Sequence, residues 1–177
     1  MLTNVFIVLA ATLASLVNWP VDQGFRISLG VVVLFAGIHL FHVKRPILWA
    51  TIGGLSISLF RILVASFSGP MTGAAASNHL WEFFFFIGYG IIYYYAVRRN
   101  TSEYPLPLVA ALTLGDAGGN FLEYYLRHLA ADGAWVTTSL LVILMAALAR
   151  SVLIVIIVWL GSRFVKEQPE RKQVRYD

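Results

Sequence analysis

Apolar stretches long enough to cross a bilayer follow one another along nearly the whole chain, and this feature constrains the fold more than any other. Of the 177 residues, 59% are hydrophobic and only 12% are charged, and the mean hydropathy is +0.75. Soluble domains carry roughly 25% charged residues, so most of the surface must meet lipid. Because a spanning helix needs roughly 20 apolar residues, the chain has room for about six short spans but for no additional soluble catalytic domain.

The turns between these stretches contain Pro, Gly, Asn and basic residues, which interrupt helices. The predicted spans are residues 2–17, 27–42, a third stretch ending at about Phe67, and residues 80–97, 105–126 and 136–164. Residues 18–24 and 68–78 are predicted as loops. We therefore predict an all-α, polytopic membrane bundle of about six transmembrane helices over residues 1–165, followed by a polar tail over residues 166–177.

The distribution of basic residues predicts the orientation, because short cytoplasmic loops retain positive charge. Nine of the thirteen Lys and Arg residues lie on one side, namely Lys44, Arg45, Arg98, Arg99, Arg163, Lys166, Arg171, Lys172 and Arg175. Arg26 and Arg127 lie on the other side, and Arg61 and Arg150 lie within spans. Both termini are thus expected in the cytoplasm of a bacterial cell, with the protein in the inner membrane.

The net charge of +4 follows from these topology signals and does not indicate a nucleic-acid partner. The absence of cysteine excludes disulfides and thiolate chemistry. The first apolar stretch has no basic residue before it and no convincing cleavage site, so we expect a retained span and not a signal peptide.

Several polar residues lie where lipid is expected, and each ionisable one costs at least roughly 2.5 kcal/mol at the bilayer centre unless it has a partner or a wet cavity. The candidate ligand-binding set is Arg26, Arg61, Glu82, Asp116, Asn120, Glu123 and Arg150. Asp116, Asn120 and Glu123 are spaced i, i+4 and i+7, so they share one helix face that must point inward.

This set predicts a polar cluster in the outer half of the bundle, and two interpretations of the cluster are compatible. In the first, a pocket open to the outside binds a small polar ligand between the helices. In the second, Arg61 and Arg150 pair with Glu82, Asp116 or Glu123 only to hold the helices together.

Other motifs give weaker predictions. His39 and His42 have a spacing that could share a metal, but placement at the interface is favoured, and we predict no metal or cofactor. Asp116 is the only aspartate inside a predicted span, so an intramembrane aspartyl protease lacks its second carboxylate, and we predict no enzyme activity. Ala10 and Ala14 form a small-residue stripe suited to a homodimer or a partner membrane subunit.

Five segments together resemble the membrane input domains of LytS-like bacterial sensor histidine kinases. They are FRISLGVVVLF (25–35), the Gly-Gly and LFRIL stretch (53–63), HLWEFFFFIGYG (79–90), GGNFLEYYLR (118–127) and ARSVLIVII (149–157). The chain also resembles, more distantly, the S components of energy-coupling factor (ECF) vitamin transporters. The resemblance covers residues 25–164.

The resemblance implies a six-helix bundle with a ligand pocket on its outer side. In a sensor, ligand binding would shift the last helix and signal through the tail. In an S component, the pocket would capture a vitamin-like substrate, and the stripe at Ala10 and Ala14 would dock on a coupling subunit. The motifs favour the sensor, whereas the length of the chain is that of a freestanding S component.

Overall fold

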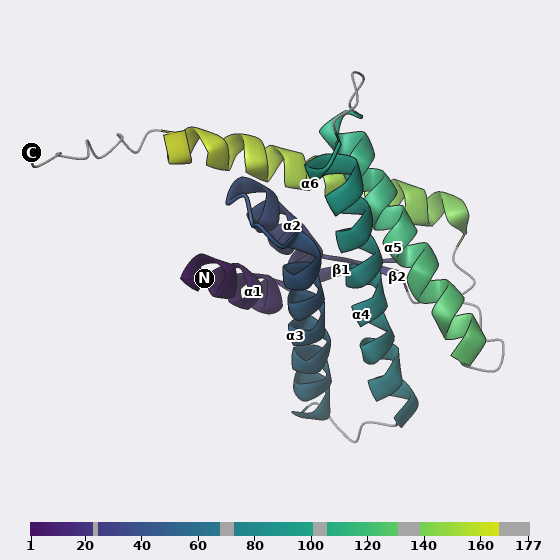
Figure 1. Cartoon of the computed structure of the whole chain (residues 1–177). Helices are drawn as coiled ribbons and strands as arrows, with labels where there is room; N and C mark the ends of the chain where they lie inside the picture. The colour runs from purple at the N-terminus through teal and green to yellow at the C-terminus, as the bar shows by residue number, and fades with distance from the viewer. Residues whose placement is uncertain (23–24, 68–72, 101–105, 131–138, 167–177) are drawn as a thin grey trace, which may run out of the picture.

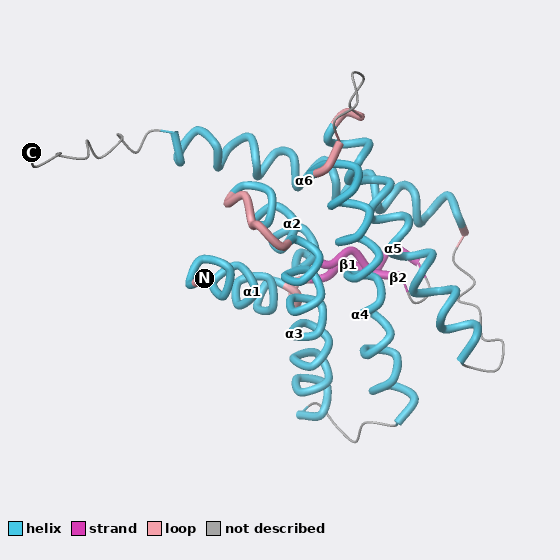
Figure 2. The backbone as a smooth tube through the Cα atoms, viewed as in Figure 1, coloured by secondary structure: helices cyan, strands magenta, loops and turns pink. Residues whose placement is uncertain are grey.

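The computed structural model describes residues 1–22, 25–67, 73–100, 106–130 and 139–166, and helices dominate it. The helices are α1 (Leu2–Ala14), α2 (Leu29–Leu40), α3 (Pro46–Phe67), α4 (Gly73–Tyr93), α5 (Leu108–Ala130) and α6 (Leu140–Lys166). A short π-helix, η1 (Tyr94–Arg98), continues α4. Figures 1 and 2 show α3, α4 and α5 side by side, with α6 running across the upper part of α5 and packing on α5 and α2. The predicted all-α fold is confirmed, with six α-helices in the described residues.

Two short strands, β1 (Asn18–Asp22) and β2 (Phe25–Ser28), form an antiparallel ribbon between α1 and α2 (Figure 2). The predictions of a simple loop over 18–24 and of a helix starting at 27 were therefore wrong. Pro20 cannot continue a helix, and Trp19 opposite Ile27 is a β-favouring pair. Ser28 then caps α2, because its hydroxyl accepts a hydrogen bond from the Gly30 amide over 3.2 Å.

The start of α4 also differs from the prediction. Residues 68–78 were expected to form a loop, but α4 already begins at Gly73, while residues 68–72 lie outside the described residues. Three consecutive alanines follow Gly73, and alanine has the highest helix propensity. The prediction of a loop gave too little weight to the helix propensity of these alanines.

Among the described residues, three helices are long and apolar enough to cross a membrane. They are the stretches Pro46–Phe67, His79–Arg98 and Leu140–Phe164. At 23 residues α5 is also long enough, at roughly 34 Å, but it carries the charged face described below. The helices α1 and α2 have 13 and 12 residues, which is roughly 20 and 18 Å and short of a hydrocarbon core of about 30 Å.

The main apolar core of the described residues contains side chains from all six helices, most of them from α2 and α4. Phe35 of α2 stacks on Tyr89 of α4 with ring centroids 3.6 Å apart, and both rings are fully buried. The helices α4 and α5 approach closely at Gly119, where a Cβ atom would lie 2.6 Å from the Phe85 carbonyl oxygen. This contact fixes the polar face of α5 against α4, which positions the candidate site.

Candidate functional site

The polar face predicted on α5 points into the protein. Asp116, Asn120 and Glu123 are 0%, 5% and 8% exposed, whereas Leu114 and Phe121 on the same helix are about half exposed, at 54% and 50%. The prediction that this face looks inward is confirmed. The carboxylates therefore need partners within the protein, because lipid offers none.

Asp116 pairs with Arg150 of α6 at the centre of the structure. Arg150 Nη2 donates to Asp116 Oδ1 over 2.5 Å, and the two side chains are 4% and 0% exposed. Asn120 Nδ2 donates to the same carboxylate oxygen over 2.9 Å and to the Asp116 carbonyl over 2.8 Å. The Arg150 guanidinium also lies 5.6 Å from the centroid of the Phe85 ring. This pair joins α5 to α6 in a buried environment.

Arg61 of α3 joins four elements of the fold. It pairs with Glu82 of α4. Its Nη2 donates to the Ser28 hydroxyl over 2.7 Å and to the Ser15 carbonyl over 3.1 Å. Ser15 follows α1, and Ser28 ends β2 and precedes α2. The Arg61 guanidinium therefore connects the N-terminal part of the chain, up to the start of α2, to α3 and α4. Sequence reasoning missed both serines, since nothing in their local pattern indicates so distant a partner.

Glu123 pairs with Arg127 one turn later on α5, at 2.5 Å from Nη2 and 3.0 Å from Nε. Arg127 was not in the predicted set, although its i, i+4 spacing from Glu123 could have identified it. Arg26, which was in that set, lies in β2 opposite Pro20. Its side chain lies outside the described residues.

The three pairs form one continuous series. Glu82 interacts electrostatically with Arg127, and Glu123 with Arg150. The resulting order alternates in charge, running Arg61, Glu82, Arg127, Glu123, Arg150, Asp116. We call these six residues the charge network. Its three positive and three negative charges cancel, which reduces the cost of placing them among apolar helices.

The charge network retains unused hydrogen-bonding capacity at both ends. Among the described residues, Arg61 Nε and Asp116 Oδ2 are buried and have no hydrogen-bond partner. The Ser58 hydroxyl, one turn before Arg61 on α3, has none either. Each such buried polar atom costs roughly 1–3 kcal/mol. The hydroxyl of Tyr89 is also buried, within electrostatic range of Asp116 and Arg150.

The two histidines considered as metal ligands make other contacts. His39 Nδ1 lies 3.0 Å from the Tyr93 hydroxyl, and His42 Nδ1 lies 3.4 Å from Arg98 Nη1. In the part of the chain that the structure describes, no group of three His, Asp or Glu side chains is arranged to hold a metal ion.

The fold and the charge network define the class: a helical membrane protein with a buried, internally neutral set of ionic side chains. Comparison of the chain with protein-family models, with curated proteins and with solved structures finds no match.

Proposed function

We propose that this protein is a membrane-embedded ligand-sensing domain of a bacterial signalling protein. It binds a small polar ligand from the outer side at the charge network and signals through α6. The observation that carries the proposal is the pair of unpartnered atoms, Arg61 Nε as donor and Asp116 Oδ2 as acceptor. A polar ligand could donate a hydrogen bond to Asp116 Oδ2 at one end of the network, or accept one from Arg61 Nε at the other.

The proposal includes six membrane crossings in the bacterial inner membrane, with both termini in the cytoplasm. The nine-to-two distribution of basic residues supports this orientation. The six helices give the proposed number of crossings. The β1–β2 ribbon then lies at the outer boundary of the membrane, because the open edges of a two-stranded ribbon need water or protein partners for their backbone groups.

Signalling through α6 follows from the position of Arg150. Its partner Asp116 holds α6 against α5, and a ligand that hydrogen-bonds to Asp116 would change this contact. From Arg150 the helix continues to Lys166, where the polar tail begins. A shift of α6 would therefore reach the cytoplasmic side directly.

A second candidate is an S component of an ECF-type transporter, and the surface of α1 favours it. Ala10 is exposed and Ala14 is half-buried, so the predicted small-residue stripe is available to a coupling subunit or to a second copy of the chain. The neighbouring genes separate the two candidates. A response regulator gene supports the sensor, and transporter ATPase genes support the S component.

The experiment that tests ligand binding is mass spectrometry of small molecules that copurify with the detergent-solubilised full chain. The wild type should carry one metabolite reproducibly. The double variant Asp116→Asn/Arg150→Gln removes one positive and one negative charge together, so the network stays neutral and the fold should persist. It should lose the metabolite.

Arg99→Gln is the matched control, because Arg99 is exposed and lies outside the network. It should retain the metabolite at the wild-type level. Size-exclusion chromatography of all three proteins checks that they remain folded and monodisperse. A wild type without any bound metabolite, or a well-folded double variant that still carries it, would refute the proposed site.

A further inference from the structure

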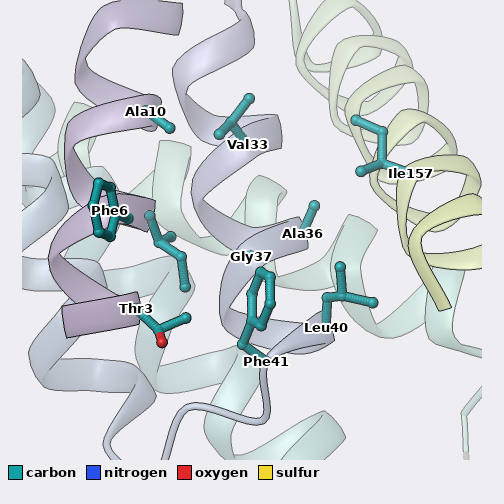
Figure 3. Close-up of a pocket in the computed structure, with 10 residues that line it drawn as sticks. Thr3, Phe6, Ala10, Val33, Ala36, Gly37, Leu40, Phe41 and Ile157 are labelled. Carbon is teal, nitrogen blue, oxygen red and sulfur yellow. The ribbon is translucent and has the colours of Figure 1, made fainter. Parts of the chain in front are cut away.

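An apolar groove of about 390 Å³ lies between α1, α2 and α6, away from the charge network. Its lining includes Phe6 and Ala10 of α1, Ala36 and Gly37 of α2, Phe41 directly after α2, and Ile157 of α6. Figure 3 shows Thr3, Leu40 and Phe41 at one end and Ala10 and Val33 at the other. The groove therefore runs along the helices and ends where α1 begins and α2 finishes.

This end of the groove adjoins a group of basic residues. Phe41 is followed in the chain by His42, Lys44 and Arg45, all of which are exposed. Arg98, from η1, reaches the same turn, where its Nη2 donates to the Val43 carbonyl over 3.2 Å. The described residues that flank this end, 1–6, 39–48, 94–100 and 157–166, include no Asp or Glu. Among the described residues, the site thus combines an apolar channel with a basic rim.

The last turns of α6 bring a further basic residue to this end. At Gly161 a Cβ atom would lie 2.8 Å from Leu40 Cδ2, so α6 packs closely on the end of α2. Two residues later, the Arg163 guanidinium lies 4.0 Å from the centroid of the Trp159 ring. The end of α6 and its basic residue therefore lie beside the end of α2.

The shape of the groove favours a narrow occupant. Ala10, Ala36 and Gly37 have small side chains, which leave room in the groove, whereas the bulky rings of Phe6 and Phe41 narrow it. A helix with its side chains is about 10–12 Å wide. The volume is in the range of small-molecule pockets, roughly 300–1,000 Å³. A flexible acyl chain fits such a channel better than a second helix does.

We propose that this groove and its basic rim form a binding site for an anionic phospholipid. One acyl chain lies in the groove between α1, α2 and α6, and the phosphate is held by Lys44, Arg45 and Arg98. Basic groups at the cytoplasmic ends of membrane helices attract anionic head groups, and the apolar groove adds selectivity for a lipid over a soluble phosphate. The inference is independent of the proposed ligand at the charge network.

Native mass spectrometry of the full chain with phosphatidylglycerol or phosphatidylcholine tests the site. The wild type should bind phosphatidylglycerol preferentially. The variant Lys44→Gln/Arg45→Gln should reduce this preference by roughly thirtyfold, as expected for two charges at the membrane surface. Arg171→Gln/Lys172→Gln loses the same charge from the tail and should keep the preference. Ala10→Phe fills the groove and should weaken the binding of both lipids.

Three outcomes would overturn the proposal. Equal retention of the two lipids by the wild type would show that the rim does not select an anion. Equal losses in the two charge variants would assign the effect to net charge alone. If Ala10→Phe leaves lipid binding intact but changes the oligomeric state measured by light scattering, the groove is an interface for another helix.

Discussion

The buried pair between Asp116 and Arg150 gives the sharpest test of how this fold is held together. Replacing Asp116 by Asn keeps the size of the side chain but removes its charge, and Arg150, with a side chain only 4% exposed, loses its ion pair with Asp116. Breaking a buried pair in this way lowers the free energy of unfolding by roughly 3–5 kcal/mol. We expect Asp116→Asn to lower it by about 3 kcal/mol, the lower end of that range, because Glu123 also attracts Arg150.

Thermal unfolding in detergent, followed by intrinsic tryptophan fluorescence, measures this loss. For a chain of this length each kcal/mol moves the midpoint by roughly 2–4 °C, so Asp116→Asn should lower it by about 6–12 °C. Arg150→Gln should cause a smaller loss, because Asn120 still donates to Asp116 over 2.9 Å.

The double variant Asp116→Asn/Arg150→Gln tests whether Asp116 and Arg150 stabilise the fold through their mutual interaction or independently of each other. Because it leaves no unpaired charge behind, its midpoint should lie well above that of Asp116→Asn alone. If the double variant instead loses the sum of the two single losses, the residues are not coupled, and the reasoning on the charge network is wrong.

Two further predictions concern packing and orientation. Gly30→Ala should lower the unfolding midpoint by several degrees, because the new Cβ would lie 2.8 Å from the Ala11 carbonyl oxygen. Overpacking of this kind costs roughly 1–3 kcal/mol of stability. Gly73→Ala is the control and should leave the midpoint unchanged, because its Cβ meets no atom within 4 Å. Because the chain has no cysteine, single cysteines report the topology. In intact cells an impermeant maleimide should label Phe67→Cys but not Lys44→Cys, and the reverse pattern would invert the proposed orientation.

Local pattern was enough to predict the helices and much of the candidate site. The long apolar stretches required six helices, because a chain of this hydropathy must satisfy its backbone groups internally. The spacing of Asp116, Asn120 and Glu123 required an inward face on α5. Glu123 and Arg127, one helical turn apart, could be paired from sequence alone.

The elements that sequence reasoning got wrong are those in which local signals compete. In residues 18–28, Pro20 and Gly24 indicate a turn, but Trp19 and Ile27 on either side pair across a ribbon. The alanines after Gly73 suit either a loop or a helix by their size, and their helix propensity prevailed.

The sequence by itself determined that this is a helical membrane protein and which polar residues must avoid lipid, because both depend on composition and on helical period. Only the tertiary structure decided how those residues pair. Arg61 lies 33 residues from Ser28 and 46 from Ser15 in the chain, and no local rule links such positions. The structure also added Arg127 to the predicted cluster and gave its charges their alternating order across α3, α4, α5 and α6. That order follows from how the helices pack, since close contacts such as the one at Gly119 decide which side chains face one another.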